Sequence, residues 1–361
     1  MADLGSTSAF YAARPEVLVE EREESSLTDG LLTMLVEENT EGLYRCEATF
    51  GNWGTSGGGV GFLYFGRDLL DFGKKLSLRI GEGEAAGLVF EGPLMGMEAH
   101  FPQGSPPEIL VLAEDRFQDL RMTRRSRTFE DASDQEVIEQ VASEHGLRTE
   151  IDIEGPTYPV LAQINQSDLA FLRERARAVD AEVWLQAGVL HAQSRARRDA
   201  GRVELTYGQS LFEFSVLADL ACQRTSLSVS GWDDSAKQPL EFEADEAAIR
   251  AELNGFLSGS SLLQQSFGER VERIVHMSPF TGQEAQSLAE ARYRSMARHF
   301  LTGRGLAEGD SRIRVGASVD LSGLGPLFDG QYYVAEACHT FDGMNGYQTR
   351  FLVERPGLGT G

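Results

Sequence analysis

FGKKLSLRIGEGEAAGLVFEGPLMGMEA, residues 72–99, has a weaker copy near the other end of the chain, RVGASVDLSGLGPLFDGQYYVAEA, residues 314–337. Each stretch runs from a glycine through an alternating strand, a glycine-rich turn and a second strand to Glu-Ala. The matched positions are Gly73 with Gly316, Phe90-Glu91-Gly92 with Phe328-Asp329-Gly330, and Glu98-Ala99 with Glu336-Ala337. The turns differ in length, so the match predicts an old duplication of one β-domain.

The glycines of RIGEGEAAGLVFEG, residues 79–92, invite a second interpretation, a phosphate-binding loop. Such a loop needs a helix starting at its last glycine, because the helix N-terminus supplies amide donors and a favourable dipole. Here a short apolar strand follows Gly87 and stops at Gly92-Pro93, and no Lys-Ser/Thr pair is nearby. The glycines therefore indicate a strand-to-strand turn. TSGGGVGF, residues 55–62, fails the same test and predicts a flexible hairpin tip.

Strand-like segments fill the chain as far as residue 128. LLTMLVEEN (31–39) and LYRCEATFGNW (43–53) are rich in residues that favour strands, and further short apolar runs follow, each bounded by Gly or Pro. No long helical pattern occurs before residue 130. This organisation predicts an antiparallel barrel or sandwich.

The periodicity becomes helical at Ser133. SDQEVIEQVASEHGL opens with a capping box, in which Ser133 caps the helix and Glu136 reaches back, and Gly146 is placed to end it. NQSDLAFLRERARAVDA predicts a second helix, and EVWLQAGVLHA predicts a hairpin around Gly188. The segment therefore reads as a small α+β unit.

The remaining chain returns to strands, interrupted by a polar segment that ends in a predicted helix with Ala285, Leu288, Ala289, Tyr293, Met296 and Phe300 on it. We therefore expect a mainly β protein with α+β insertions and two similar antiparallel barrels. The predicted parts are a flexible arm (1–13), a first barrel (14–128), an α+β middle domain (129–194), a second barrel (195–236 plus 306–356), an insertion domain (237–305) and a loose tail (357–361).

Composition narrows the possible functions. The 361 residues carry a net charge of −23, which argues against a sequence-specific nucleic-acid binder. We interpret the basic runs at 121–127 and 195–202 as solvated strand ends or partner contacts. The N-terminus lacks a secretory signal, and no apolar window is long enough for a transmembrane helix, so we expect assembly in the cytoplasm without membrane insertion. Three dispersed cysteines predict neither a disulfide framework nor a zinc site.

No catalytic constellation stands out, and we expect no enzyme, no cofactor and no metal site. The 56 carboxylates guarantee chance pairs. His339, with Cys338 and Asp342 near it, is the only cluster of ligand types; strand alternation turns either Cys338 or His339 toward the core, which favours a structural pair. The alternative is a carbohydrate-binding or peptidoglycan-degrading β protein. Its sugar-stacking residues would be Trp53, Trp184 and Trp232, but these fall in three different units, and core packing is favoured for each.

The C-terminal run GDSRIRVGASVDLSGLGPLFDGQYYVAEACHTFDGMNGYQTRFLVER resembles the end of the late control gene D family. These are tail hub proteins of contractile phages and related contractile injection systems, similar to the hub part of VgrG. The motif positions are Gly316, Gly323, Gly325, Phe328, Gly330, Tyr332, His339, Gly346, Tyr347, Thr349, Phe351 and Arg355, and the first repeat supplies Gly73, Phe90 and Gly92. Upstream helices extend the resemblance over roughly residues 105 to 355.

The resemblance implies a structural baseplate hub, a homotrimer in which two barrels per chain form a pseudo-six-fold ring. Such a ring joins a trimeric spike to a hexameric inner tube and starts tube assembly. The expected partners are the spike, the inner tube protein and other baseplate subunits. Because the sequence ends at Gly361 without a β-prism repeat, we expect the spike to be a separate protein. The sequence leaves open whether the particle is a phage tail or another injection system.

Overall fold

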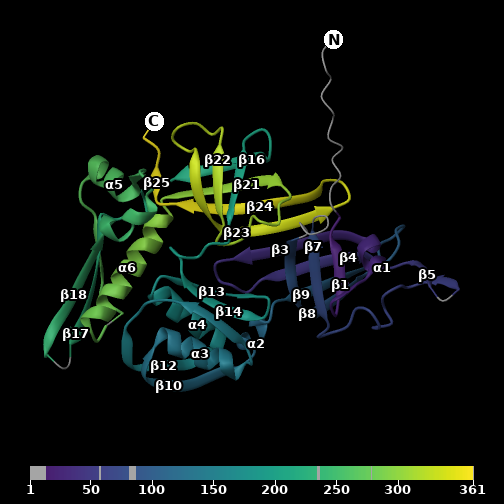
Figure 1. Ribbon diagram of the computed structural model, residues 1–361, viewed down its shortest axis with the longest axis horizontal. Coiled ribbons are helices and arrows are strands. Elements are labelled where there is room, and N and C mark those ends of the chain that lie inside the picture. The colour runs from purple at the N-terminus through teal and green to yellow at the C-terminus, as the bar shows by residue number, and fades with distance from the viewer. Residues whose placement is uncertain (1–13, 57, 81–86, 234–235, 278, 361) are drawn as a thin grey trace, which may run out of the picture.

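One large sheet dominates the computed structural model, which describes residues 14–56, 58–80, 87–233, 236–277 and 279–360 (Figure 1). The sheet has thirteen strands; eleven follow the order β16-β21-β24-β23-β3-β4-β9-β8-β7-β1-β2, while β22 pairs with β23 and β15 pairs with β22. The mainly β fold with helical insertions is the predicted class. The predicted arm, residues 1–13, and the turn glycines 81 and 83 lie outside the described residues.

The first lobe of the sheet is built from the N-terminal strands around a shared apolar core that includes Val36, Phe50 and Leu78. Its elements are β1 (Glu16–Val19), β2 (Arg22–Glu23), α1 (Ser25–Gly30), β3 (Leu31–Asn39), β4 (Arg45–Gly51), β7 (Lys75–Ile80), β8 (Gly87–His100) and β9 (Glu108–Glu114). β5 (Gly54–Ser56) and β6 (Gly59–Gly61) form a separate hairpin at the position predicted for a hairpin tip.

The second lobe consists of β15 (Arg202–Thr206), β16 (Leu211–Ala218), β21 (Leu301–Glu308), β22 (Ser318–Ser322), β23 (Gly330–Asp342) and β24 (Gly346–Arg355). It has its own core, which includes Val319 and Val353. β23 joins the lobes: its first residues pair with β22, and residues 336–342 lie between β24 and β3. The two lobes are thus one continuous sheet.

The lobes repeat one another strand by strand. β3, β4, β7, β8 and β9 correspond to β16, β21, β22, β23 and β24, with the same antiparallel neighbours. Bulges occur at equivalent places, between Leu94 and Gly96 and between Val334 and Glu336. A second equivalent pair of bulges separates Leu31 from Thr33 and Leu211 from Glu213. Register irregularities at matching positions define a residue-by-residue equivalence of the two lobes.

Gly73 and Gly316 are equivalent in this alignment. Their φ angles are +81° and +91°, which favour glycine, and their amides donate to the carbonyls of Leu94 and Val334 at 2.8 and 3.1 Å. Leu94 therefore corresponds to Val334.

The other sequence matches are wrong by two residues. With Leu94 equivalent to Val334, Phe90 corresponds to Gly330, not to Phe328, and Glu98-Ala99 corresponds to Cys338-His339. The hairpins differ because β7–β8 has a bulge between Leu78 and Arg79 that the β22–β23 pairing lacks, and because their turns differ in length.

The middle unit contains α2 (Phe117–Arg121), β10 (Arg124–Ser133), α3 (Asp134–Glu144), β11 (Arg148–Asp152), β12 (Thr157–Ser167), α4 (Asp168–Ala178), β13 (Ala181–Gln186) and β14 (Val189–Ser194). The predicted capping box is present: the Ser133 side chain accepts from the Glu136 amide, and the Glu136 carboxylate accepts from the Ser133 amide at 2.8 Å. The β13–β14 hairpin turns at Gly188, whose φ is +74°. The helices and the hairpin therefore form where the sequence predicts them.

The insertion unit contains β17 (Ser226–Asp233), β18 (Gln238–Asp245), the short 3₁₀ turns η2 (Glu246–Ala248) and η3 (Arg250–Glu252), β19 (Leu257–Ser258), α5 (Gly259–Phe267), β20 (Val271–Ile274) and α6 (Gly282–Arg298). β17, predicted in the second barrel, instead pairs with β18 and β20 and shares their core with α6. The boundary predicted at residue 236 therefore falls between two strands of this unit. The tail predicted to be loose contains β25 (Gly357–Leu358), which pairs with β19.

Candidate functional site

A buried cluster of polar side chains joins the two lobes to the middle unit. Arg198 lies in the linker after β14 and donates to the Glu182 carboxylate at 2.7 Å and to the Tyr44 hydroxyl at 3.0 Å. The Tyr333 hydroxyl donates to the same Glu182 oxygen at 2.6 Å. Tyr44 belongs to the first lobe, Glu182 to β13 and Tyr333 to β23. One guanidinium–carboxylate pair therefore holds three parts of the chain together.

Burial and stacking make this cluster rigid. The guanidinium of Arg198 lies 3.9 Å from the centre of the Trp184 ring, and its side chain is 3% exposed. Burial raises the pKa of Tyr44 to about 12, so its hydroxyl stays protonated near neutral pH. Because breaking a buried ion pair leaves an uncompensated charge, the cluster resists any motion that separates its members.

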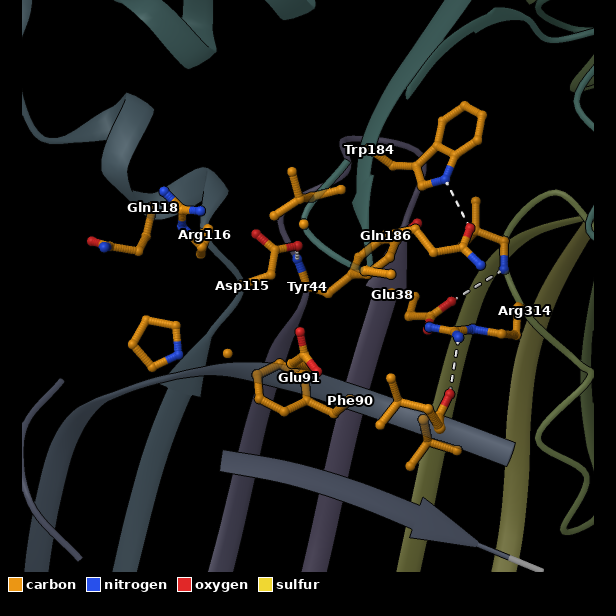
Figure 2. Close-up of a pocket in the computed structure, with 18 of the residues that line it drawn as sticks. Glu38, Tyr44, Phe90, Glu91, Asp115, Arg116, Gln118, Trp184, Gln186 and Arg314 are labelled. Atoms are coloured by element: carbon orange, nitrogen blue, oxygen red, sulfur yellow. Dashed lines mark hydrogen bonds and ion pairs between the residues drawn. The ribbon is translucent and has the colours of Figure 1, made fainter. Parts of the chain in front are cut away.

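A second ion pair joins the lobes next to this cluster (Figure 2). Arg314, just before β22, donates from Nε to the Glu38 carboxylate on β3 at 2.8 Å and from Nη1 to the Leu88 carbonyl at 3.1 Å. The carboxylate of Glu38 is almost fully buried. The contacts from one arginine to β3 and β8 fix the angle between the lobes.

These groups border a pocket of roughly 870 Å³ between the first lobe and the β13–β14 hairpin (Figure 2). Its apolar wall includes Val89, Phe90 and Trp184. Each lining cation has an acidic neighbour: Lys75 with Glu91, Arg116 with Asp119, Arg198 with Glu182 and Arg314 with Glu38. No serine, threonine, cysteine or histidine is among the described lining residues. The charged groups of the wall are thus engaged with one another beside an apolar surface.

Asp115 is the one strongly shifted carboxyl in the pocket wall. Burial raises its pKa to about 7, although it accepts amide hydrogen bonds from Tyr44 at 3.0 Å and Phe117 at 2.9 Å. It has no base or nucleophile as a partner in these contacts. Its oxygens hold the start of β4 against α2, which is a structural role.

The motif residues of the sequence analysis lie at turns and in the cores, and only Gly73, Phe90 and Gly92 line the pocket. Six glycines of the motif have positive φ: Gly73, Gly316, Gly323, Gly325, Gly330 and Gly346. The buried members are Phe90, Tyr332, His339, Tyr347, Thr349, Phe351 and Arg355, and Phe328 is partly buried. The motif is therefore not assembled into one site.

Gly316 has a second constraint besides its backbone angle. A Cβ at this position would lie 2.5 Å from Nε of Arg198. We predict that Gly316→Ala lowers the free energy of unfolding by about 1–3 kcal/mol, because it combines an unfavourable φ with displacement of a buried arginine. Urea denaturation measures the loss. Gly188→Ala is the control, since its φ is also positive but nothing lies within 4 Å; an equal loss in both variants would contradict the role given to Arg198.

His339 faces the core, and Cys338 is partly buried, as strand alternation requires. The Nδ1 atom of His339 lies 2.8 Å from the Tyr347 hydroxyl and 3.3 Å from the Thr349 hydroxyl. Asp342 is turned away and caps the following turn through the amides of Met344 and Asn345. The described residues contain no group of three or more possible metal ligands. Burial lowers the pKa of His339 to about 4, so the imidazole is neutral near pH 7.

This shift predicts a pH dependence of stability. Between pH 6.5 and about 4 the unfolded chain binds a proton at this histidine that the folded chain does not, so stability falls as the pH falls through this window. We expect the loss from His339 to reach about 3 kcal/mol. Urea denaturation from pH 7.5 to 4 should show a weaker dependence in His339→Gln than in the exposed control His276→Gln. Equal slopes would show that His339 does not titrate as its burial implies.

The buried arginines were not recognised from the sequence. The run 195–202 was interpreted as a solvated strand end or a partner contact, but the side chain of Arg198 is buried, and that of Arg195 is 12% exposed and pairs with Glu354. Their acidic and aromatic partners lie in other units, so no local pattern marks them. Core packing was predicted for all three tryptophans. The prediction is right for Trp184, which is buried, and wrong for Trp53 and Trp232, which are 47% and 49% exposed.

The Alg8 N-terminal domain family matches residues 64–342, which is more than half of the chain. The chain belongs to this family. The match covers β7–β9 of the first lobe, the middle unit, the insertion unit and the second lobe as far as the end of β23. No curated protein sequence matches the chain. This match does not show membership of the late control gene D family.

Solved structures share the fold of this Alg8-family chain. The 43 kDa tail protein of prophage MuSo2 from Shewanella oneidensis has a TM-score of 0.68 at 13% identity, covering 95% of this chain and 98% of its own. A tail protein from Neisseria meningitidis has a TM-score of 0.66 at 12% identity, and the match covers 97% of this chain and 98% of the Neisseria protein. A component of the Escherichia coli type VI secretion system, described as similar to the phage T4 tail proteins gp27 and gp5, has a TM-score of 0.52 at 13% identity, covering 90% and 73%. The fold is therefore of the tail-protein type.

Among the described residues, no helix combines the length and the apolar character that crossing a membrane requires.

Proposed function

We propose that this chain is the structural hub of a contractile tail or injection system, a homotrimer that joins a trimeric spike to a hexameric inner tube. The observation that carries the proposal is the repeat of the two lobes, with equivalent strand order and equivalent bulges. Three chains then present six similar lobes. A three-fold assembly can in this way match a six-fold tube.

The fold and the site support this role. The tail proteins of prophage MuSo2 and of Neisseria meningitidis share the fold over nearly their whole length. The buried ion pairs at the junction hold the two lobes at a fixed angle, as a closed ring requires of each of its parts. We further propose that the late control gene D resemblance reflects common descent, and that the protein assembles in the cytoplasm with the spike, the inner tube and other baseplate subunits.

The alternative of a carbohydrate-binding or peptidoglycan-degrading β protein has less support. The exposed tryptophans lie in separate units, Trp53 beside the β5–β6 hairpin and Trp232 on β17, and Trp184 is buried. Of the carboxylates that line the pocket, Glu38, Glu91 and Asp119 are paired with cations, and Asp115 and Asp199 accept backbone amides, so each already has a structural partner.

Mass in solution tests the proposed function. We expect a species of about three times the 39.6 kDa of one chain at micromolar concentration, or on addition of the trimeric spike. Analytical ultracentrifugation gives the mass, and release of soluble fragments from purified peptidoglycan measures the alternative activity. A chain that stays monomeric in both conditions would overturn the hub proposal, and release of peptidoglycan fragments by that monomer would support the alternative.

A further inference from the structure

The open strand edges of the described residues include two in the large sheet, on β16 and on the second half of β8. β16 is the last strand at one end of the sheet order and pairs only with β21. The second half of β8, residues 94–100, pairs with β9 on one side, while β7 ends its pairing at Pro93. Unpaired edges of this kind are templates for pairing with another chain.

The repeat shows what covers the equivalent edges. In the second lobe, residues 336–342 of β23 correspond to residues 96–102, and they pair with residues 33–39 of β3. In the first lobe, β3 itself corresponds to β16, as the bulges after Leu31 and Leu211 show. The chain therefore contains a second copy of each of the two strands that pair at the internal junction: β8 repeats β23, and β16 repeats β3. Neither copy has the corresponding partner within the described part of the chain.

Burial differs at equivalent positions as a missing partner predicts. Phe341 is 8% exposed and belongs to the core of the first lobe, whereas its equivalent Phe101 is 62% exposed. Val36 is fully buried on β3, whereas its equivalent Val216 is only partly buried on β16. Leu217, next to it, is 60% exposed.

Phe101 is also part of an exposed aromatic cluster. Its ring centre lies 6.1 Å from that of Phe62 and 6.0 Å from that of Phe65, and Phe62 lies 5.2 Å from Trp53. Each of these four side chains is at least 37% exposed. An exposed apolar cluster beside an open strand edge is typical of a protein–protein contact.

We propose that residues 96–101 pair antiparallel with β16 of a second copy of this chain, in the register that β23 and β3 adopt within one chain. Within the chain, His339 lies opposite Val36 and Phe341 opposite Met34. The equivalent pairs between copies are Ala99 with Val216 and Phe101 with Phe214. The β8 edge of one copy meets the β16 edge of the next, so the contact is heterologous and can close into a ring.

The proposed contact rests on the proposed function only for the number of copies, which is three. It lacks one feature of the internal junction: Glu38 and Arg314 correspond to Ala218 and Asp71, which cannot form an ion pair. The internal junction therefore has an ion pair that the contact between copies does not. This difference favours pairing of β23 with the β3 of its own chain, and leaves β8 and β16 for the neighbour.

Cysteine cross-linking tests the register. In a Cys222→Ser background, which removes the exposed thiol, the two test variants are Ala99→Cys with Val216→Cys and His100→Cys with Ser215→Cys. Adjacent antiparallel pairs alternate between hydrogen-bonded and closer non-hydrogen-bonded sites, so at least one variant places its thiols at the closer spacing. The control, Ala99→Cys with Ala218→Cys, is displaced by two residues, and its Cβ atoms would be about 7 Å apart.

After mild oxidation we expect covalent dimers and trimers on non-reducing gels from at least one in-register variant, and several-fold less from the control. A species of trimeric mass without these cross-links, or with stronger ones in the control, would overturn the register and leave the hub proposal standing. A chain that is monomeric with and without the spike would contradict both.

Phe101→Ala provides a second measurement that needs no disulfide. We expect it to raise the concentration for half-assembly about tenfold or more, with an unchanged circular dichroism spectrum. The matched control is Phe72→Ala, since Phe72 is 57% exposed but lies outside the proposed contact. Equal effects of the two variants on assembly would argue against the proposed contact.

Discussion

Arg298→Met should lower the free energy of unfolding by about 3–5 kcal/mol. The guanidinium of Arg298, at the end of α6, donates to Asp180 at 2.8 Å and to Glu252 at 2.7 Å, and its side chain is 3% exposed. Methionine retains much of the length of the side chain but removes the charge, so Glu252 loses its cation and Asp180 keeps only Arg294, at 3.8 Å. Asp180 follows α4 of the middle unit, whereas Glu252 and Arg298 belong to the insertion unit. The variant should therefore also weaken the contact between these two units.

The control is an arginine–aspartate pair of similar distance in solvent. Arg312 donates to Asp310 at 2.6 Å, but its side chain is 71% exposed, so Arg312→Met should cost less than about 1 kcal/mol. Urea denaturation followed by circular dichroism gives both values, and limited proteolysis shows whether the insertion unit is released first. Similar losses in the two variants would mean that burial does not strengthen the Arg298 cluster.

Local sequence signals predicted local structure well. The capping box at Ser133 and Glu136 needs only contacts three residues apart, and it forms as predicted. Gly73 and Gly316 were matched correctly because both occupy a left-handed conformation that strongly favours glycine. The Phe-acid-Gly triplets were matched two residues out of register, because neither the bulge after Leu78 nor the exact lengths of the two turns can be recognised from side-chain types alone.

Long-range contacts account for most of what the sequence could not show. Arg198 reads as part of a basic run, yet its partners Tyr44 and Glu182 lie 154 and 16 residues away. β17 has the alternation of a barrel strand, but its pairing with β18 and β20 depends on a fold that closes around α6. The open edges of β8 and β16 are likewise visible only once the pairing of every other strand is known.

Phe341→Ala should lower the free energy of unfolding by about 3–5 kcal/mol. Phe341 lies on β23, a strand of the second lobe, yet its ring packs in the core of the first lobe. Truncation leaves a cavity there and removes an apolar contact between the lobes. We expect a lower midpoint in urea, measured at a protein concentration at which the chain is monomeric.

Phe101→Ala is the matched control, because Phe101 occupies the equivalent place in the repeat and is 62% exposed. In the monomer, Phe101→Ala should lower the free energy of unfolding by less than about 1 kcal/mol, since the Phe101 side chain is already largely in contact with water in the folded chain. The same substitution at two equivalent positions thus separates what the chain covers by itself from what it leaves for a neighbour. Equal destabilisation of the monomer would mean that Phe101 is already packed within its own chain, and its exposure would no longer support the proposed contact.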